Sequence, residues 1–344
     1  MGIKHEDVKA TGDKGYASEW NKDHTIDGNV DVNKKQLLSM AIENRTDYPA
    51  GPVAGQVIYR TDLGYPAVWD GSGWRRMKAE PRTATIVVAA SDSVDTSSAD
   101  YVCDGTADDV QIQAALSAVP ATGGRVLLLE GTYNISAQMT IASSGTTISG
   151  QGAGTILKTS GSMNSGYCFY ATGKDNITIE NMKITLTADL YPDGTIWLDG
   201  SDKSTIRGCW LNFGASFQVY LTGSSDVTVI NCYIADSDTL IRAISCAGGR
   251  IVGNYLYDAL VGMQIKDSLS FTVSANTIDE VGDEGLLIDN TGRSAFVGNV
   301  VTNSSSGGLV NVNSPDRVTE VANTLNGGLT GATTNSEVVH NVLT

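Results

Sequence analysis

Asn231-Cys-Tyr-Ile234 and Ala275-Asn-Thr-Ile278 are two copies of a short motif that recurs through the second half of the chain. The motif is a small residue, then Cys or Asn, one variable residue and an aliphatic residue; the other copies are Gly208-Cys-Trp-Leu211, Gly253-Asn-Tyr-Leu256, Gly298-Asn-Val-Val301 and Ala322-Asn-Thr-Leu325. Successive copies lie 23, 22, 22, 23 and 24 residues apart, counted at Cys209, Cys232, Asn254, Asn276, Asn299 and Asn323. A second column keeps the same period, at Leu198, Leu221, Ile244, Ile265, Ile288 and Val312. Two columns with one period indicate an internal structural repeat.

A repeat of this length is too short for a helical hairpin, but it holds three short strands joined by turns. In one copy we expect strands at Ile196–Asp199, Ser204–Arg207 and Cys209–Asn212. Each coil would then rise by one strand spacing, roughly 4.8 Å. Asn at the same bend of successive coils can pass amide hydrogen bonds up the stack. We therefore expect Asn276→Leu to destabilise the fold by roughly 1–3 kcal/mol.

The segment before the repeat indicates how the stack begins. Asp104–Leu116 (DGTADDVQIQAAL) and Gly123–Tyr133 (GGRVLLLEGTY) resemble the entry segment of viral tailspike and pectate-lyase-like proteins. We expect a helix from Asp108 to about Ala118, whose first N–H groups meet the carboxylates of Asp108 and Asp109. This helix would cover the open first coil, which otherwise exposes unpaired strand edges.

The resemblance gives the full fold prediction. The chain is expected to be all-β, a right-handed single-stranded parallel β-helix of the pectate-lyase-like type with a small β-rich N-terminal domain. The predicted divisions are residues 1–82 for virion attachment and oligomerisation, 83–135 for the entry segment with its capping helix, and 136–344 for the β-helix.

The N-terminal region lacks the repeat. Pro52–Asp62, followed by Ala67–Trp74 with its Asp70-Gly71 turn, reads as a small meander. It resembles short modules of phage tail fibres. We expect Trp69 and Trp74 to belong to its core.

Composition excludes several classes of function. The formal net charge of −15 over 344 residues argues against nucleic acid and anionic membranes as partners. No signal peptide and no membrane-spanning run is recognisable, which predicts synthesis in the host cytoplasm without membrane insertion. The five cysteines show no CxxC spacing and are expected to be buried free thiols. No cofactor and no metal site is predicted.

In pectate-lyase-like proteins the glycan cleft runs along the first strand of each coil and the loops that lead into it. Carried over residue by residue, the resemblance implies these glycan-binding candidates: Trp197, Asp199, Tyr220, Gln264, Lys266 and Asp289. The same face would include Thr222, Ser245, Leu287 and Asn311. Trp197 and Tyr220 form an aromatic column that we expect to contact sugar. For a second column, Trp210 with Tyr233 and Tyr255, we favour a protomer interface.

The loops that lead into this face are acidic, and their candidate catalytic residues are Asp236, Asp258, Glu280, Asp283 and Glu284. The first three each follow a strand-end aliphatic residue by two positions and should stack on adjacent coils. Close carboxylates raise one another's pKa, and glycoside hydrolysis needs one proton donor and one base or nucleophile. A solvated acidic edge and a cation site are the alternatives, and we favour the solvated edge.

Three features of the sequence bear on catalysis. The first strand carries no Asp-Asp pair and no Arg-rich signature of calcium-dependent pectate lyases, and His5, His24 and His340 lie outside the face. A lyase would have only Lys266 as its base, and Lys266 with Asp289 reads as a surface ion pair.

The resemblance implies a viral tailspike or tail-fibre protein of the virion, which binds a host cell-surface polysaccharide. The expected partners are two further copies in a homotrimer and other tail or baseplate proteins, reached through the N-terminal region. A glycan depolymerase of the same fold, either hydrolase or lyase, is the first alternative. A cellular surface β-helix protein without ligand chemistry is the second.

Overall fold

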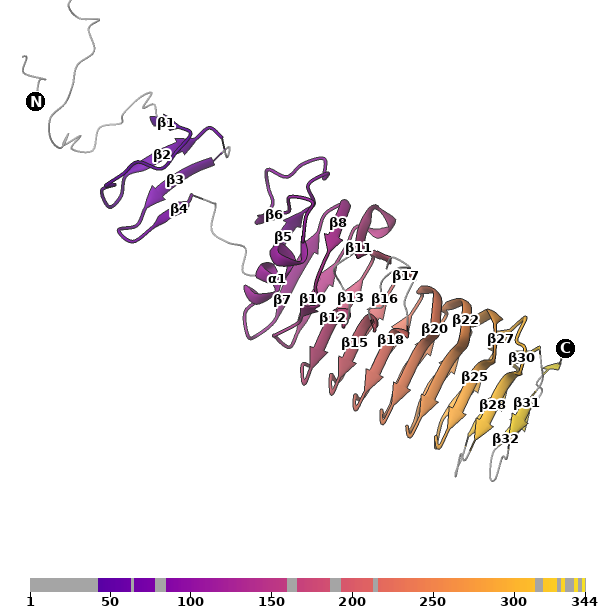
Figure 1. Cartoon of the computed structure of the whole chain (residues 1–344). Coiled ribbons are helices and arrows are strands. Elements are labelled where there is room, and N and C mark those ends of the chain that lie inside the picture. The colour runs from indigo at the N-terminus through magenta and orange to yellow at the C-terminus, as the bar shows by residue number, and fades with distance from the viewer. Residues whose placement is uncertain are drawn as a thin grey trace, which may run out of the picture. The chain divides into compact units, whose positions relative to one another are not determined.

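The computed structural model describes residues 43–62, 65–77, 85–159, 166–185, 193–212, 216–312, 318–326, 329–331, 337–339 and 342–343 (Figure 1). The chain forms two compact units, Met1–Lys78 and Ala79–Thr344. The boundaries expected at residues 82 and 135, like the role of the N-terminal region in attachment, stay predictions.

The first unit is a four-stranded sheet in sequence order, made of β1 (Glu43–Arg45), β2 (Val57–Arg60), β3 (Tyr65–Trp69) and β4 (Trp74–Arg76). The pairs β2–β3 and β3–β4 are antiparallel, which confirms the meander, and β1 joins β2 in parallel. Ile58 and Ala67 are its buried apolar residues. Trp69 and Trp74 are half-buried, with ring centroids 5.8 Å apart, so they cover this small core and do not fill it.

The second unit is a parallel β-helix in which successive coils pair strand by strand (Figure 1). One sheet of 12 strands holds β5 (Thr85–Ala89), β6 (Tyr101–Val102), β7 (Gly124–Leu128), β10 (Thr146–Ser149), β13 (Thr178–Glu180), β16 (Thr205–Arg207), β19 (Thr228–Ile230), β21 (Arg250–Val252), β23 (Thr272–Ser274), β26 (Ala295–Val297), β29 (Thr319–Val321) and β32 (Glu337–Val339). From β7 onward these are the second strands of the coils.

The other sheet, of 17 strands, contains the first and third strands of the coils. Its members are β8 (Gly131–Ile135), β9 (Met139–Thr140), β11 (Thr155–Thr159), β12 (Tyr167–Thr172), β14 (Lys183–Thr185), β15 (Gly194–Asp199), β17 (Trp210–Asn212), β18 (Phe217–Thr222), β20 (Tyr233–Ile244), β22 (Tyr255–Lys266), β24 (Thr277–Val281), β25 (Glu284–Asp289), β27 (Val300–Val301), β28 (Gly307–Val312), β30 (Thr324–Leu325), β31 (Leu329–Gly331) and β33 (Val342–Leu343). In β20 and β22 the third strand of one coil continues into the first strand of the next. A short 3₁₀ helix, Gly152–Gly154, precedes β11.

Inward side chains of successive coils fill one continuous core, and the predicted aliphatic column is correct except for two shifts of one residue. Leu221 pairs with Ala243, which is buried, while Ile244 is half-buried and belongs to the outer surface. In β28 it is Val312 that pairs with the outward residue Asp289. In β20, period-two alternation makes the shift from Ile244 to Ala243 an inversion of faces.

The predicted asparagine ladder is confirmed. Asn276 Nδ2 donates to Asn299 Oδ1 (2.9 Å) and to the carbonyl oxygen of Ile251 (2.9 Å). Asn276 Oδ1 accepts from the Nδ2 (2.9 Å) and the backbone N–H (3.0 Å) of Asn254. The Nδ2 of Asn299 continues the series to Asn323 Oδ1 (3.0 Å). All four amides are buried and linked coil to coil.

The small residue at the start of the motif has a backbone cause. The position before each ladder residue has a positive φ, for example 67° at Gly253 and 53° at Asn231. Glycine and asparagine adopt this left-handed conformation at the least cost. The motif therefore consists of a tight corner residue followed by an inward Asn or Cys side chain.

Helix α1 (Asp109–Ser117) packs its buried face on the first coil, as expected of a cap. The expected role of its two acidic residues was wrong, because neither carboxylate accepts from the helix's own N–H groups. Asp108 instead accepts from the backbone N–H of Asn134 (2.7 Å), and Asp109 from that of Ser136 (2.7 Å). They fasten the cap to the end of β8. No helix in the described ranges is both long and apolar enough to cross a membrane.

Candidate functional site

The first strands of successive coils present one outward column of side chains on a single face. The register places Tyr170, Trp197, Tyr220, Arg242 and Gln264 side by side, on β12, β15, β18, β20 and β22. All five are half-buried. The structure thus brings three of the predicted glycan-binding residues together, with Arg242 between them.

A second outward column runs two residues further along the same strands and is polar. Asp199 accepts hydrogen bonds from the hydroxyls of Thr172 (3.1 Å) and Thr222 (2.7 Å). Lys266 Nζ lies 3.1 Å from Asp289 Oδ2, which confirms the expected ion pair. Because the partners sit on adjacent coils, these contacts hold the strands of the face in register.

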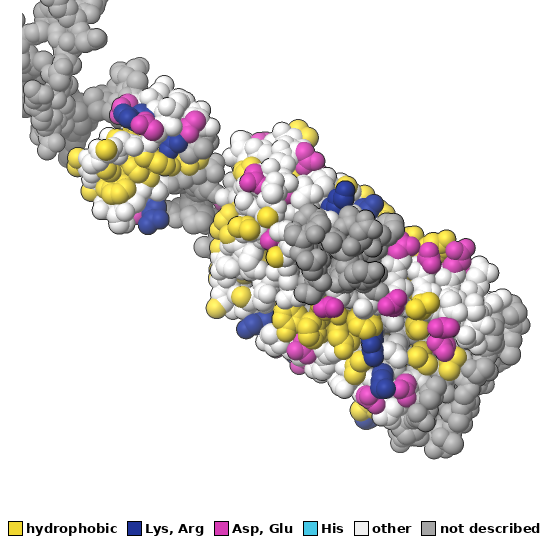
Figure 2. Space-filling view, in the orientation of Figure 1, with side chains coloured by type: hydrophobic (Ala, Val, Ile, Leu, Met, Phe, Trp, Pro, Cys, Tyr) yellow, Lys and Arg dark blue, Asp and Glu magenta, His cyan; other side chains and the backbone are white. Residues whose placement is uncertain are grey.

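Four half-buried rings form what we call the aromatic face: Tyr170, Trp197, Phe217 and Tyr220. The Trp197 ring centroid lies 4.7 Å from that of Tyr170 and 5.7 Å from that of Tyr220, and Phe217 lies 4.9 Å from Tyr220. Figure 2 shows hydrophobic side chains gathered over β12, β15 and β18, with basic side chains next to them.

The rings of the aromatic face are held in place from below and from the side. Trp197 Nε1 donates to Thr222 Oγ1 (2.9 Å), so the indole is tied to the Asp199 network. The buried Tyr167 packs under Trp197 with a centroid distance of 5.3 Å. Burial, with the nearby Asp193 carboxylate, raises the pKa of the Tyr167 phenol and keeps it neutral. The face is therefore preformed.

The sequence interpretation missed Tyr170, Phe217 and Arg242 on this face. The guanidinium carbon of Arg242 lies 4.8 Å from the Phe217 ring centroid and 5.9 Å from that of Tyr220. The prediction put Ile244 inside, which placed Ser245 on the face and Arg242 off it. Ser245 instead occupies a corner with φ 55°, and Asn311, also expected on the face, pairs with the inward Ile288.

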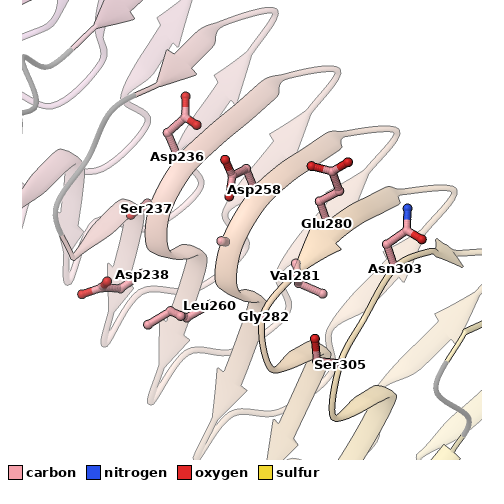
Figure 3. A pocket seen from close by; sticks show the side chains of 11 residues that line it. Asp236, Ser237, Asp238, Asp258, Leu260, Glu280, Val281, Gly282, Asn303 and Ser305 are labelled. Atoms are coloured by element: carbon pink, nitrogen blue, oxygen red, sulfur yellow. The ribbon is translucent and has the colours of Figure 1, made fainter.

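Asp236, Asp258 and Glu280 stack on successive coils, as predicted, and Asn303 follows them (Figure 3). They do not lie in loops, because each acidic residue is inside a continuous strand, β20, β22 or β24. Each of the four sits at a sharp bend with φ between 52° and 60°. Together with their neighbours they line an open hollow of about 700 Å³.

The bend gives part of this acidic column a structural explanation. Asp and Asn adopt positive φ more readily than most residues, so Asp236, Asp258 and Asn303 suit the backbone there. Glu280 has no such preference, and its Oε2 accepts from the Tyr257 hydroxyl (2.7 Å). The predicted partners Asp283 and Glu284 are not among the described residues that line the hollow.

Asp236 has a perturbed pKa, and it lies beside Asp258 at the start of the acidic column. Partial burial, and then the Asp258 carboxylate beside it, raise the pKa of Asp236 above its ordinary value. A raised carboxyl pKa is what a general acid needs, but it is also what any two close carboxylates show.

We expect Asp236→Asn to raise the melting temperature at about pH 7 and to leave it unchanged at about pH 3. With its pKa raised in the folded state, Asp236 favours folding only below its ordinary pKa, and this contribution is lost as the pH rises through the folded value. Asparagine keeps the bend and cannot ionise. The gain should be a few tenths of a kcal/mol, as for other partly exposed charges.

Asp258→Asn is the matched variant for this measurement. It removes the charge that opposes ionisation of Asp236, so it should reproduce part of the gain, and the double variant should gain less than the sum. If the melting temperatures of wild type and Asp236→Asn changed in parallel from pH 3 to pH 7, the pKa of Asp236 would not be raised in the folded protein.

The second aromatic column lies on the third strands. Tyr233 and Tyr255 stack with centroids 5.6 Å apart, and Trp210 pairs with Tyr233 in register. Trp210 is 43% exposed. With Lys183 it lines a hollow of about 300 Å³. The predicted protomer interface at this column stays a prediction.

All five cysteines are buried free thiols, as predicted. The three histidines lie outside the described residues.

Comparison with known proteins places this geometry in a family. Residues 144–325 match the model of the right-handed β-helix region. Among solved structures, the A-module of the Azotobacter vinelandii mannuronan C-5 epimerase AlgE4 is 13% identical, with a TM-score of 0.54, over 70% of this chain and 92% of that one. DFA-IIIase from Arthrobacter chlorophenolicus A6 is 11% identical, with a TM-score of 0.53, over 75% and 76% of the two chains.

ORF18 of Geobacillus virus E2 is 13% identical, with a TM-score of 0.49, over 87% of this chain and 72% of that one. A search of curated proteins gives no match. The family match spans more than half of the chain, and the chain belongs to the right-handed β-helix family.

Proposed function

We propose that the protein is a viral tailspike or tail-fibre protein that binds a host cell-surface glycan on the aromatic face. The observation that carries the proposal is the preformed row of rings Tyr170, Trp197 and Tyr220, tied at the indole to Thr222 and Asp199. Sugar rings present flat C–H surfaces that stack on aromatic rings, and their hydroxyls need polar partners close by.

The arrangement suits binding because it costs little to organise. The rings lie on strands and not on mobile loops, and their polar supports are already hydrogen-bonded. A ligand that follows the coils would meet the aromatic rings first and then Gln264 and the Lys266–Asp289 pair. Preorganised contacts lose less entropy when a flexible polysaccharide binds. The related A-module is named for its action on mannuronan, which agrees with a glycan as ligand.

The viral part of the proposal is supported by the sequence resemblance of Asp104–Leu116 and of the N-terminal meander to tailspike and tail-fibre segments. Homotrimerisation and docking of the N-terminal region to the particle belong to the same proposal. Depolymerase activity is the alternative, and the observation that favours it is the raised pKa of Asp236 beside Asp258. The bend conformation of both residues is why we place binding first.

We expect Trp197→Ala to weaken retention of host envelope polysaccharide by about tenfold, because removing one stacking ring costs about 1–2 kcal/mol. The purified full chain is incubated with the polysaccharide, and both the bound fraction and the polysaccharide length are measured. Trp197→Phe keeps a ring and should lose less.

Trp210→Ala is the control, since it removes an exposed tryptophan from the other aromatic column. Equal losses for the two alanine variants would refute binding at the aromatic face. If wild type shortens the polysaccharide and Asp258→Asn does not, the protein is a depolymerase and not only a binder.

A further inference from the structure

Arg242 is a half-buried cation to which the protein supplies no counter-charge. Among the described residues, no carboxylate lies within 4.0 Å of its guanidinium, whereas the buried Arg60 and the half-buried Lys266 each have an acidic partner within that distance. Its Nε is buried and makes no hydrogen bond. A half-buried guanidinium without a counter-charge is costly unless an anion completes it.

The charges around Arg242 leave it as the one uncompensated cation of this face within the described part of the chain. Asp199 is occupied by two threonine hydroxyls, and Lys266 is neutralised by Asp289. The neighbours in register, Tyr220 and Gln264, carry no charge. Arg242 thus brings an unpaired positive charge next to the rings on a chain whose net charge is −15.

The rings also fix how the guanidinium is presented. Arg242 lies over the rings of Phe217 and Tyr220, a contact that orients the planar group. A guanidinium matches a planar oxyanion with two parallel hydrogen bonds, and because Nε is buried, the two terminal nitrogens are the ones that a ligand would meet. A lysine would offer a point charge without this geometry.

We infer that the glycan bound here is acidic and that Arg242 reads its charged group, a carboxylate or a sulfate. This rests on the proposed function, because the sugar ring that bears the anion must stack on the neighbouring aromatic face. Gln264 follows Arg242 in register and offers an amide to the hydroxyls of the same sugar unit. Arg242 is then a specificity-determining residue, and the aromatic rings supply affinity for any sugar.

The test is an array of bacterial surface polysaccharides in matched forms: native, carboxyl-reduced and, where sulfated, desulfated. Wild type should bind an acidic polysaccharide at least about tenfold more tightly than its neutralised form, since a charge-assisted bidentate contact is lost. Loss on carboxyl reduction identifies a carboxylate, and loss on desulfation identifies a sulfate.

Variants separate specificity from net charge. Arg242→Gln should bind the native and neutralised forms equally, at the level of wild type with the neutralised form. Arg242→Lys should recover only part of the preference. Arg250→Gln removes the same charge from an exposed position on the 12-stranded sheet and should keep the full preference.

The outcomes are distinct for the two claims. Binding of neutral polysaccharides alone, or an equal preference in wild type and Arg242→Gln, overturns the acidic glycan and leaves the glycan-binding proposal standing. Binding to no member of the array, with Trp197→Ala indistinguishable from wild type, overturns both. If Arg250→Gln loses the preference for the acidic form as fully as Arg242→Gln does, the preference comes from net charge, and the role of Arg242 is also overturned.

Discussion

Asn276→Leu is expected to lower the free energy of unfolding by about 3 kcal/mol, at the upper end of the range anticipated for a buried amide. The substitution removes the acceptor of two N–H groups of Asn254 and the donor to Asn299 Oδ1 and to the Ile251 carbonyl. All of these atoms are in the interior, where no water replaces the lost partner. Unfolding in denaturant, followed by circular dichroism, measures the change.

Thr277→Leu is the control, because it places the same side chain one residue later, at a half-buried outward position of β24. It should change stability by less than about 1 kcal/mol. If Asn276→Leu unfolded at the wild-type denaturant concentration, the hydrogen-bonded ladder would contribute nothing to stability.

Gly194→Ala is expected to cost about 3 kcal/mol or more, for steric and not polar reasons. A Cβ at Gly194 would overlap the backbone carbonyl of Phe217 on the next coil and approach Tyr167 Cε1 to 2.7 Å. Neither neighbour yields easily, because the first is backbone and the second is a buried ring beneath Trp197. The melting temperature is the measurement.

Gly154→Ala provides the matched comparison. Its Cβ would meet only Glu130 Cβ at 3.6 Å, an ordinary contact, and its φ is not positive. Alanine there should be neutral or stabilise slightly by restricting the unfolded chain. Equal melting temperatures for the two variants would show that coils around Gly194 can separate without cost.

The period, the three-strand coil and the ladder were predictable because each leaves a column of one residue type in the sequence. Asn276 and Asn299 stand at fixed spacing since the same corner needs the same amide in every coil. The ion pair of Lys266 and Asp289 followed from the same register. Because every coil has the same length and shape, residues at a fixed spacing in the sequence lie next to one another in space.

The wrong predictions concern positions where residue type alone does not determine which way a side chain faces or which partner it binds. Ile244 is the more apolar residue, yet Ala243 is inside, because one residue of length between corners decides the face. That single shift concealed Arg242. Asp109 looked like a helix cap, but Ser136, distant in sequence, offered it a better N–H group. Long-range partners of this kind leave no local signal.

The outward column on the first strands has a consequence for how such a protein diversifies. At equivalent backbone positions it carries an aromatic ring at Tyr220, a guanidinium at Arg242, an amide at Gln264 and an aliphatic chain at Leu287. The coil accepts all four, so folding exerts little selection there, while inward residues and corners are constrained. Under the proposed function, lineages that meet hosts with different surface polysaccharides can exchange these residues singly, and we expect strain-to-strain divergence to concentrate in this column.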